Sequence, residues 1–151
     1  MSPSPESSRT SVEIASAYVA GLSASDAGAL QALRSDDFVL EFVHGDAFED
    51  PPRSAREAEL FWPRWFVAFP EMDLEVIRTI AADEVVVTQW IFTGTNSGPL
   101  ESMFGVKRIE PTGNTVRLRG VTFLDIREGR IIKETTYFDV ATLLIELGVR
   151  L

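Results

Sequence analysis

The fold is decided by residues 115–148, which read TVRLRGVTFLDIREGRIIKETTYFDVATLLIELG. Apolar and polar residues alternate on both sides of Arg127-Glu-Gly129. This period predicts two half-buried strands, over 115–126 and 130–138, with the three residues between them forming a tight hairpin turn. After the second strand, Asp139 is expected to cap a final helix. The stretch therefore predicts two long paired strands that lead into a short helix.

Two further helices begin at capping patterns upstream of this stretch. The patterns are Thr10-x-x-Glu13 and Ser54-x-x-Glu57, in which each side chain can bond the other residue's backbone N–H. A shorter helix is expected over residues 25–33. Pro63 lies inside the helix that starts near Ser54, and we expect it to kink or interrupt that helix.

Three more strands are predicted by β-branched and aromatic residues over 38–44, 74–80 and 84–95. The order is thus two helices, a strand, a helix, four strands and a last helix that Gly148 ends. We expect one α+β domain over residues 10–151, in which a curved mixed sheet wraps around the helices. Residues 1–9, rich in Ser and Pro, are expected to form a disordered tail.

The composition excludes several classes of function. The chain has 151 residues, with 14 Lys and Arg against 23 Asp and Glu, a net charge of −9. This balance argues against nucleic acid or an anionic membrane as partner. No cysteine and one histidine leave no thiolate or His-rich metal site, and we expect neither a metal nor another cofactor. With no signal-peptide pattern and no long apolar run, we expect a cytoplasmic protein.

The inward faces of the predicted strands are apolar and carry few polar groups, a pattern typical of a small-molecule pocket. The polar groups are His44, Thr88, Thr122, Glu134 and Thr136. Thr122 and Thr136 are candidate hydrogen-bond donors to a substrate. The apolar side chains expected to contact substrate are Leu40, Phe42, Trp65, Trp90, Phe92 and Leu118. We therefore expect a hydrophobic small molecule as the ligand.

Residues 126–139 and the leucine-rich helix after them resemble the C-terminal signature of SnoaL-like polyketide cyclases. Trp90-Ile-Phe-Thr-Gly-Thr95 and Pro111-Thr-Gly113 also suit that family. The resemblance implies the larger nuclear-transport-factor-2-like fold, a cone-shaped curved sheet around a deep apolar pocket that helices close. It also implies a homodimer, because proteins of this fold are often dimeric.

The resemblance does not extend to the catalytic groups of these relatives. Cyclases and limonene-type epoxide hydrolases carry an aspartate three residues before the position of Asp139, where this chain has Thr136. The cyclase histidine corresponds to Thr122, and the Arg-x-Asp pair of the epoxide hydrolases corresponds to Trp90 and Phe92. Neither set of acid and base groups is therefore carried over.

With the catalytic groups of the relatives absent, Glu134 is the residue that says most about the function of the pocket. The two-residue period places Ile132, Glu134, Thr136 and Phe138 on the inward face of their strand and Ile131 on the other face. A carboxylate in an apolar pocket has a raised pKa, which suits a general acid or base near neutral pH. The alternative is an ion pair between Glu134 and a nearby arginine, Arg117 or Arg119.

His44 ends the strand predicted over 38–44, on its apolar face. It is the candidate proton partner of Glu134, or a group that orients a substrate carbonyl. The alternative is an ordinary residue at the rim of the pocket or in the core.

Two functions remain open at this point. The first is a cofactor-independent cyclase or isomerase of a polyketide-like intermediate, in which Glu134 and His44 move protons; epoxide opening followed by ring closure is a close variant. The second is a non-catalytic small-molecule-binding or assembly protein on the same fold, which the loss of the relatives' aspartates favours.

Overall fold

The computed structural model describes residues 10–43, 53–101 and 107–149, and these ranges form four helices and one six-stranded sheet. The helices are α1 (Ser11–Ser23), α2 (Ala27–Leu33), α3 (Ala55–Ala68) and α4 (Val140–Leu147). The strands are β1 (Arg34–Val43), β2 (Arg53–Ser54), β3 (Asp73–Ala81), β4 (Val85–Thr95), β5 (Thr115–Arg127) and β6 (Arg130–Phe138).

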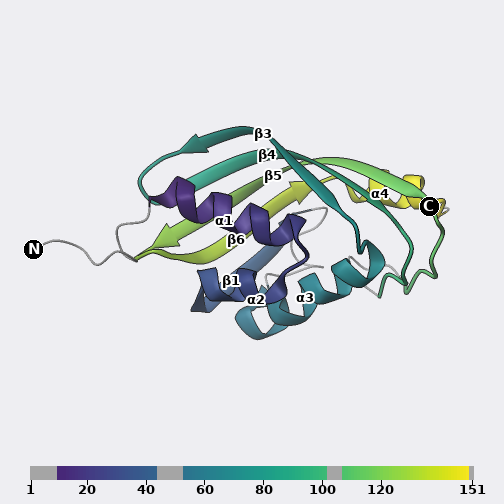
Figure 1. Ribbon diagram of the computed structural model, residues 1–151, viewed down its shortest axis with the longest axis horizontal. Coiled ribbons are helices and arrows are strands. Elements are labelled where there is room, and N and C mark those ends of the chain that lie inside the picture. The colour runs from purple at the N-terminus through teal and green to yellow at the C-terminus, as the bar shows by residue number, and fades with distance from the viewer. Residues whose placement is uncertain (1–9, 44–52, 102–106, 150–151) are drawn as a thin grey trace, which may run out of the picture.

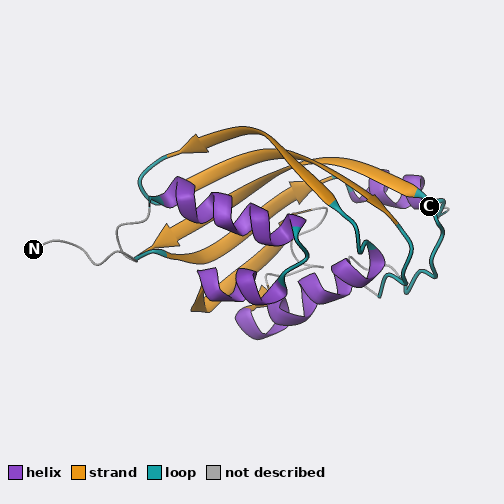
Figure 2. Cartoon of the chain, in the orientation of Figure 1, coloured by secondary structure: helices purple, strands orange, loops and turns teal. Residues whose placement is uncertain are grey.

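The sheet has the strand order β2-β1-β6-β5-β4-β3. Only β1 and β6 are parallel neighbours, and every other neighbouring pair is antiparallel. The sheet curves strongly, with α1, α2 and α3 on its concave side (Figures 1 and 2). Helix α4 lies beside the start of β5, where Glu146 accepts from the Arg117 backbone N–H. This arrangement confirms the predicted α+β fold, a curved mixed sheet wrapped around helices.

The helix starts follow the capping patterns. The Ser54 side chain accepts a hydrogen bond from the Glu57 backbone N–H, and the Glu57 carboxylate accepts one from the Ser54 N–H. Asp139 caps α4 in the predicted way, by accepting from the backbone N–H of Ala141 at 2.9 Å. The expected interruption at Pro63 is wrong, because α3 runs continuously from Ala55 to Ala68 with Pro63 inside it.

The sequence period fails at the start of β6. The pairing of β5 with β6 skips a residue, since Asp125 faces Lys133 while Ile126 faces Ile131. This bulge inserts Ile132 and reverses the alternation before it. Ile131 is therefore fully buried and Ile132 only half-buried, the opposite of the prediction. From Glu134 onward the inward face is as predicted, so the bulge does not disturb the site.

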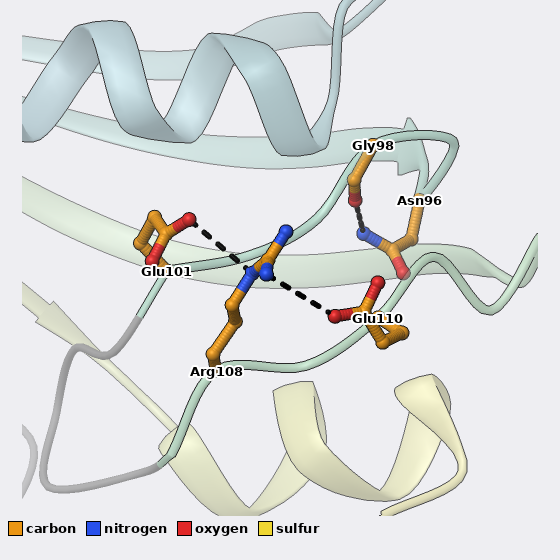
Figure 3. Close-up of polar contacts among 5 residues, drawn as sticks. All are labelled: Asn96, Gly98, Glu101, Arg108 and Glu110. Atoms are coloured by element: carbon orange, nitrogen blue, oxygen red, sulfur yellow. Dashed lines mark hydrogen bonds and ion pairs between the residues drawn. The ribbon is translucent and has the colours of Figure 1, made fainter.

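The connection from β4 to β5 is held by a buried side chain, Asn96. Its amide donates to the carbonyl oxygens of Gly98 at 2.9 Å and Ala68 at 3.3 Å, so it ties the connection to the end of α3. Farther out, Arg108 forms exposed ion pairs with Glu101 and Glu110 (Figure 3). Pairs of this kind add little stability, so Asn96 is the structural anchor.

The tail predicted over residues 1–9 lies outside the described residues. Within the described ranges, the helices are too short or too polar for any of them to cross a membrane.

Candidate functional site

A cavity of about 60 Å³ lies between the concave face of the sheet and helices α1 and α3. A cavity of this size has room for a few water molecules. Its walls are mostly apolar, and the aromatic side chains among them are Phe42, Phe61, Trp62, Trp65, Trp90, Phe92 and Phe138. The polar groups among the lining residues are Tyr18, Thr88, Thr122, Glu134 and Thr136. An apolar enclosure with a few convergent polar groups is the usual architecture of a small-molecule site.

Most of the predicted site residues meet at this cavity. Those that line it are Phe42, Trp65, Trp90, Phe92, Leu118, Thr122, Glu134 and Thr136. Leu40 is fully buried, but it belongs to the packed core and is not among the lining residues. His44, the predicted proton partner of Glu134, lies outside the described residues.

Glu134 is fully buried, and its partner comes from the first helix. The Tyr18 hydroxyl donates a hydrogen bond to Glu134 Oε2 at 2.5 Å. Tyr18 lies on the buried face of α1, and sequence reasoning did not single it out as a site residue. Its hydroxyl was the available signal, because a buried tyrosine oxygen needs a hydrogen-bond partner.

A buried arginine stands behind this tyrosine. Arg34 donates to the Tyr18 hydroxyl oxygen from Nη2 at 2.7 Å and from Nε at 3.2 Å. Its guanidinium also lies over the ring of Phe38, 4.6 Å from the ring centroid. The chain Arg34–Tyr18–Glu134 thus joins the start of β1, the middle of α1 and the middle of β6.

The alternative prediction, an ion pair of Glu134 with Arg117 or Arg119, is wrong. Arg117 and Arg119 are exposed, and they lie on the outer face of β5. The arginine near Glu134 is Arg34, and it reaches the carboxylate only through Tyr18. Sequence reasoning missed Arg34 because its strand was expected to begin at residue 38, whereas β1 begins at Arg34.

The electrostatics of the cluster follow from burial. Loss of water raises the pKa of Glu134 above its ordinary value, while the Tyr18 hydrogen bond and the charge of Arg34 act in the opposite direction. Burial, together with the neighbouring Glu134, also raises the pKa of Tyr18 well above its ordinary value. Tyr18 therefore stays protonated at neutral pH and can donate its hydrogen bond to the Glu134 carboxylate.

Trp62 and Thr136 complete the surroundings of Glu134, and both lower its pKa. The Trp62 indole N–H nevertheless makes no hydrogen bond of standard geometry among the described residues. Its effect on the carboxylate is thus that of a long or misaligned contact, which is weaker than a hydrogen bond of standard geometry. Tyr18 is therefore the group that holds Glu134 most firmly.

A second polar chain crosses the strands β4, β5 and β6. Trp90 Nε1 donates to Thr122 Oγ1 at 2.8 Å, and Thr122 Oγ1 lies 2.8 Å from Thr136 Oγ1. Gly120 makes room for this arrangement, since a Cβ there would lie 2.3 Å from the Trp90 ring. The predicted substrate donors Thr122 and Thr136 therefore bond each other.

Metal ligands are not gathered at this site. In the described ranges, no group of three or more His, Cys, Asp or Glu side chains is placed to hold a metal ion. Among the lining residues that the structure describes, Glu134 is the one that carries a full charge as a carboxylate. The arrangement can thus bind an apolar molecule and exchange a proton with it at one buried carboxylate.

Comparison with known proteins agrees with this geometry. The sequence model of the SnoaL-like polyketide cyclase family matches residues 12–147, which is nearly the whole chain. The chain belongs to the SnoaL-like polyketide cyclase family. Among curated proteins, none matches this SnoaL-like chain significantly.

Solved structures show the same fold. IdmH of Streptomyces antibioticus, named as a candidate polyketide cyclase, is 26% identical, with a TM-score of 0.70 over 91% of this chain and 98% of that one. AclR of Streptomyces galilaeus, named as a candidate hydroxylase, is 24% identical, with a TM-score of 0.73 over 91% of this chain and 84% of that one.

A third structure is similar over its full length. It is a candidate SnoaL-like polyketide cyclase from Jannaschia sp. CCS1, which is 19% identical, with a TM-score of 0.77 over 100% of this chain and 99% of that one. The fold and the family are thus shown, while the different reactions named for these proteins leave the chemistry to be argued from the site.

Proposed function

We propose that this SnoaL-like protein is a cofactor-independent cyclase or isomerase of an apolar, polyketide-like compound. In this proposal Glu134 exchanges a proton with an activated carbon or hydroxyl group of the substrate. Epoxide opening followed by ring closure uses the same group and is a close variant. Membership of the SnoaL-like polyketide cyclase family supports the substrate class.

The observation that carries the proposal is the environment of Glu134. Its carboxylate is buried in the wall of an apolar cavity and has a raised pKa, and no arginine among the described residues hydrogen-bonds to it directly. A structural ion pair would place a guanidinium on the carboxylate and hold its pKa low. A raised pKa brings the carboxylate closer to neutral pH, where a general acid or base works best.

The other predicted site residues take two roles in this proposal. Trp65, Trp90 and Phe92 form the aromatic wall against which the substrate folds. Thr122 and Thr136 hold that wall, because their hydroxyl groups bond each other and the Trp90 indole. His44 remains the proposed second proton group.

Entry of a polycyclic substrate requires the cavity to widen. A volume of about 60 Å³ is smaller than a polycyclic ring system needs. We propose that the aromatic side chains of α3 move outward when substrate enters, or that only the reacting end of the substrate reaches Glu134.

The test is Glu134→Gln on a panel of cyclisable polyketides, with ring-closed product measured by chromatography and mass spectrometry. We expect turnover to fall by about 10²–10⁴-fold, the usual contribution of a general acid or base. Glu146→Gln is the matched control, since Glu146 lies on α4, where its carboxylate accepts from the Arg117 backbone N–H. Equal turnover of wild type and Glu134→Gln would refute the catalytic role.

A second candidate is a non-catalytic binding protein. The observation that favours it is that Thr122 and Thr136, at the catalytic positions of the relatives, bond each other. Calorimetry that finds tight binding of an apolar compound, with no product formed by wild-type protein, would favour this candidate over the cyclase.

We also propose that the protein is a homodimer formed through the outer face of the sheet. Large apolar side chains are exposed there: Ile77, Ile80, Phe123 and Tyr137. The same face carries Arg119 and Asp125, so a two-fold related copy can set opposite charges against each other. Light scattering coupled to size-exclusion chromatography measures the mass, and a monomer at every concentration would refute the dimer.

A further inference from the structure

Arg34 lies next to the site, and the proposed function gives it no role. Its side chain is buried, and it is not among the residues that line the cavity. It donates two hydrogen bonds to the Tyr18 oxygen, at 2.7 and 3.2 Å, and the same hydroxyl group donates to Glu134 Oε2. A buried guanidinium is always charged, so the protein accepts a cost to keep this cation there.

The two donors of Arg34 fix the direction of the Tyr18 hydroxyl. A phenol oxygen has two lone pairs and one O–H group. Because two N–H groups of Arg34 approach the lone pairs, the O–H is the group left to face Glu134 Oε2. Without Arg34, the hydroxyl is free to rotate away, or to accept a hydrogen bond from a protonated Glu134.

The charges of the buried groups also link Arg34 to Glu134. Arg34 needs a nearby anion, and Glu134 is the carboxylate that Tyr18 connects to it. The side chains that act on Glu134 are Tyr18 from α1, Arg34 at the start of β1, Trp62 from α3 and Thr136 from β6. Arg34 is the only cation among these four, and its charge acts together with the hydrogen bond from Tyr18 to offset the burial of a negative charge.

We propose that Arg34 is a positioning residue for the proposed reaction: it locks the Tyr18 hydroxyl onto Glu134 Oε2, so that Glu134 rests as a carboxylate and accepts a proton from substrate on its other oxygen. The proton-transfer step breaks a substrate C–H or O–H bond, leaves the electron pair on the substrate and places the proton on Glu134. The proton returns to the substrate in the closing step, so no oxidant or reductant is needed. This inference rests on the proposed function of Glu134 as a proton-transfer group.

The first measurement needs no substrate. The carboxyl carbon of Glu134 is followed by NMR in protein labelled with ¹³C-glutamate, and its signal is identified by its loss in Glu134→Gln. We expect Arg34→Met to raise the pKa of Glu134 by about one unit or more, because a neighbouring opposite charge is removed. Arg34→Lys keeps the charge but lacks the two-pronged contact, so its value should lie between those of wild type and Arg34→Met.

Arg130→Met is the control, since it removes an arginine of β6 whose Nη1 donates to the Ala32 carbonyl oxygen at 2.8 Å and not to Tyr18. This control should leave the pKa of Glu134 unchanged. An unchanged or lowered value in Arg34→Met would overturn the inference. If Arg34→Met does not fold, the comparison rests on Arg34→Lys, and a value in this variant equal to wild type would also overturn it.

The second measurement uses 2-indanone, a small apolar ketone with acidic C–H groups, and follows uptake of deuterium from D₂O. We expect the pH midpoint of the exchange rate to rise in Arg34→Met by the shift seen in the pKa of Glu134. A purely structural role of Arg34 would lower stability and leave this midpoint in place. A wild-type protein that exchanges no proton of 2-indanone counts against the proposed function, while the NMR titration still decides the role of Arg34.

Discussion

Two polar chains border the same cavity, and they are built in different ways. Trp90, Thr122 and Thr136 come from strands that are neighbours in the sheet, and Thr122 faces Thr136 directly in the β5–β6 pairing. The chain Arg34–Tyr18–Glu134 instead runs through a helix: β1 and β6 are neighbours in the sheet, but it is Tyr18 of α1 that connects Arg34 to Glu134. The first chain is neutral and the second contains two ionisable groups and a permanent cation.

The difference indicates that one chain stabilises the wall of the pocket and that the other tunes the proposed proton-transfer group. Neutral hydrogen bonds between neighbouring strands stabilise the wall at a small cost, because each group is satisfied at short range. The desolvation cost of a buried charge pair can exceed what the attraction contributes to stability, so we attribute this chain to its effect on the carboxylate. Each of the following predictions concerns a substitution that disrupts one of these two hydrogen-bonded chains.

Removal of the bridging hydroxyl should have the largest effect. Tyr18→Phe leaves Arg34 and Glu134 buried without their shared partner, and we expect a loss of about 3 kcal/mol in the free energy of unfolding. Urea denaturation measures this loss. Tyr137→Phe, the same change at the exposed second tyrosine, should cost less than about 0.5 kcal/mol. Equal effects of the two variants would contradict the importance of the bridge.

Crowding the neutral chain should have the next largest effect. Gly120→Ala places a methyl group where the Trp90 ring lies, and we expect a loss of about 2 kcal/mol from overpacking. The indole N–H signal of Trp90 in NMR spectra should move as its bond to Thr122 breaks. Gly28→Ala is the control, since its Cβ would meet only Asp26 at 3.5 Å. An unmoved indole signal in Gly120→Ala would show that the ring adapts without loss of the bond.

The charged chain should also make stability depend on pH. Because burial raises the pKa of Glu134 in the folded protein, the folded state binds this proton more tightly than the unfolded state does. The stability it contributes is present at low pH and is lost as pH rises from the ordinary glutamate range through the raised value. The unfolding free energy of Glu134→Gln minus that of wild type should therefore grow with pH in this range, by at most about 1.4 kcal/mol per pH unit. Thermal or urea unfolding over a pH series measures it, and a constant or shrinking difference would reject the raised pKa.

Loss of one neutral hydroxyl should have the smallest effect. Thr122→Val keeps the shape of the side chain and removes the acceptor of the Trp90 N–H, so we expect a loss of about 1 kcal/mol. Thr115→Val is the control, because the Thr95–Thr115 contact is exposed and should contribute little. A loss in Thr122→Val as large as that in Tyr18→Phe would remove the distinction between the two chains.

Local patterns predicted much of the fold and part of the site. The capping pairs at Ser54 and Asp139 and the hairpin before β6 were predicted because each depends on residues close together in the sequence. The inward direction of Glu134 followed from the two-residue period of β6. That period failed at Ile131 and Ile132, since a bulge depends on the partner strand and leaves no mark in the strand's own alternation.

The sequence by itself determined an acidic α+β chain with a carboxylate on an apolar strand face, because alternation, capping and charge are properties of neighbouring residues. Only the tertiary structure decided what that carboxylate meets. Tyr18 reaches Glu134 because α1 crosses the concave face of the sheet (Figure 1), and Arg34 reaches Tyr18 because β1 begins beside it. These contacts arise from the packing of elements far apart in the chain, and the energy of a buried charge depends on the partners that this packing supplies.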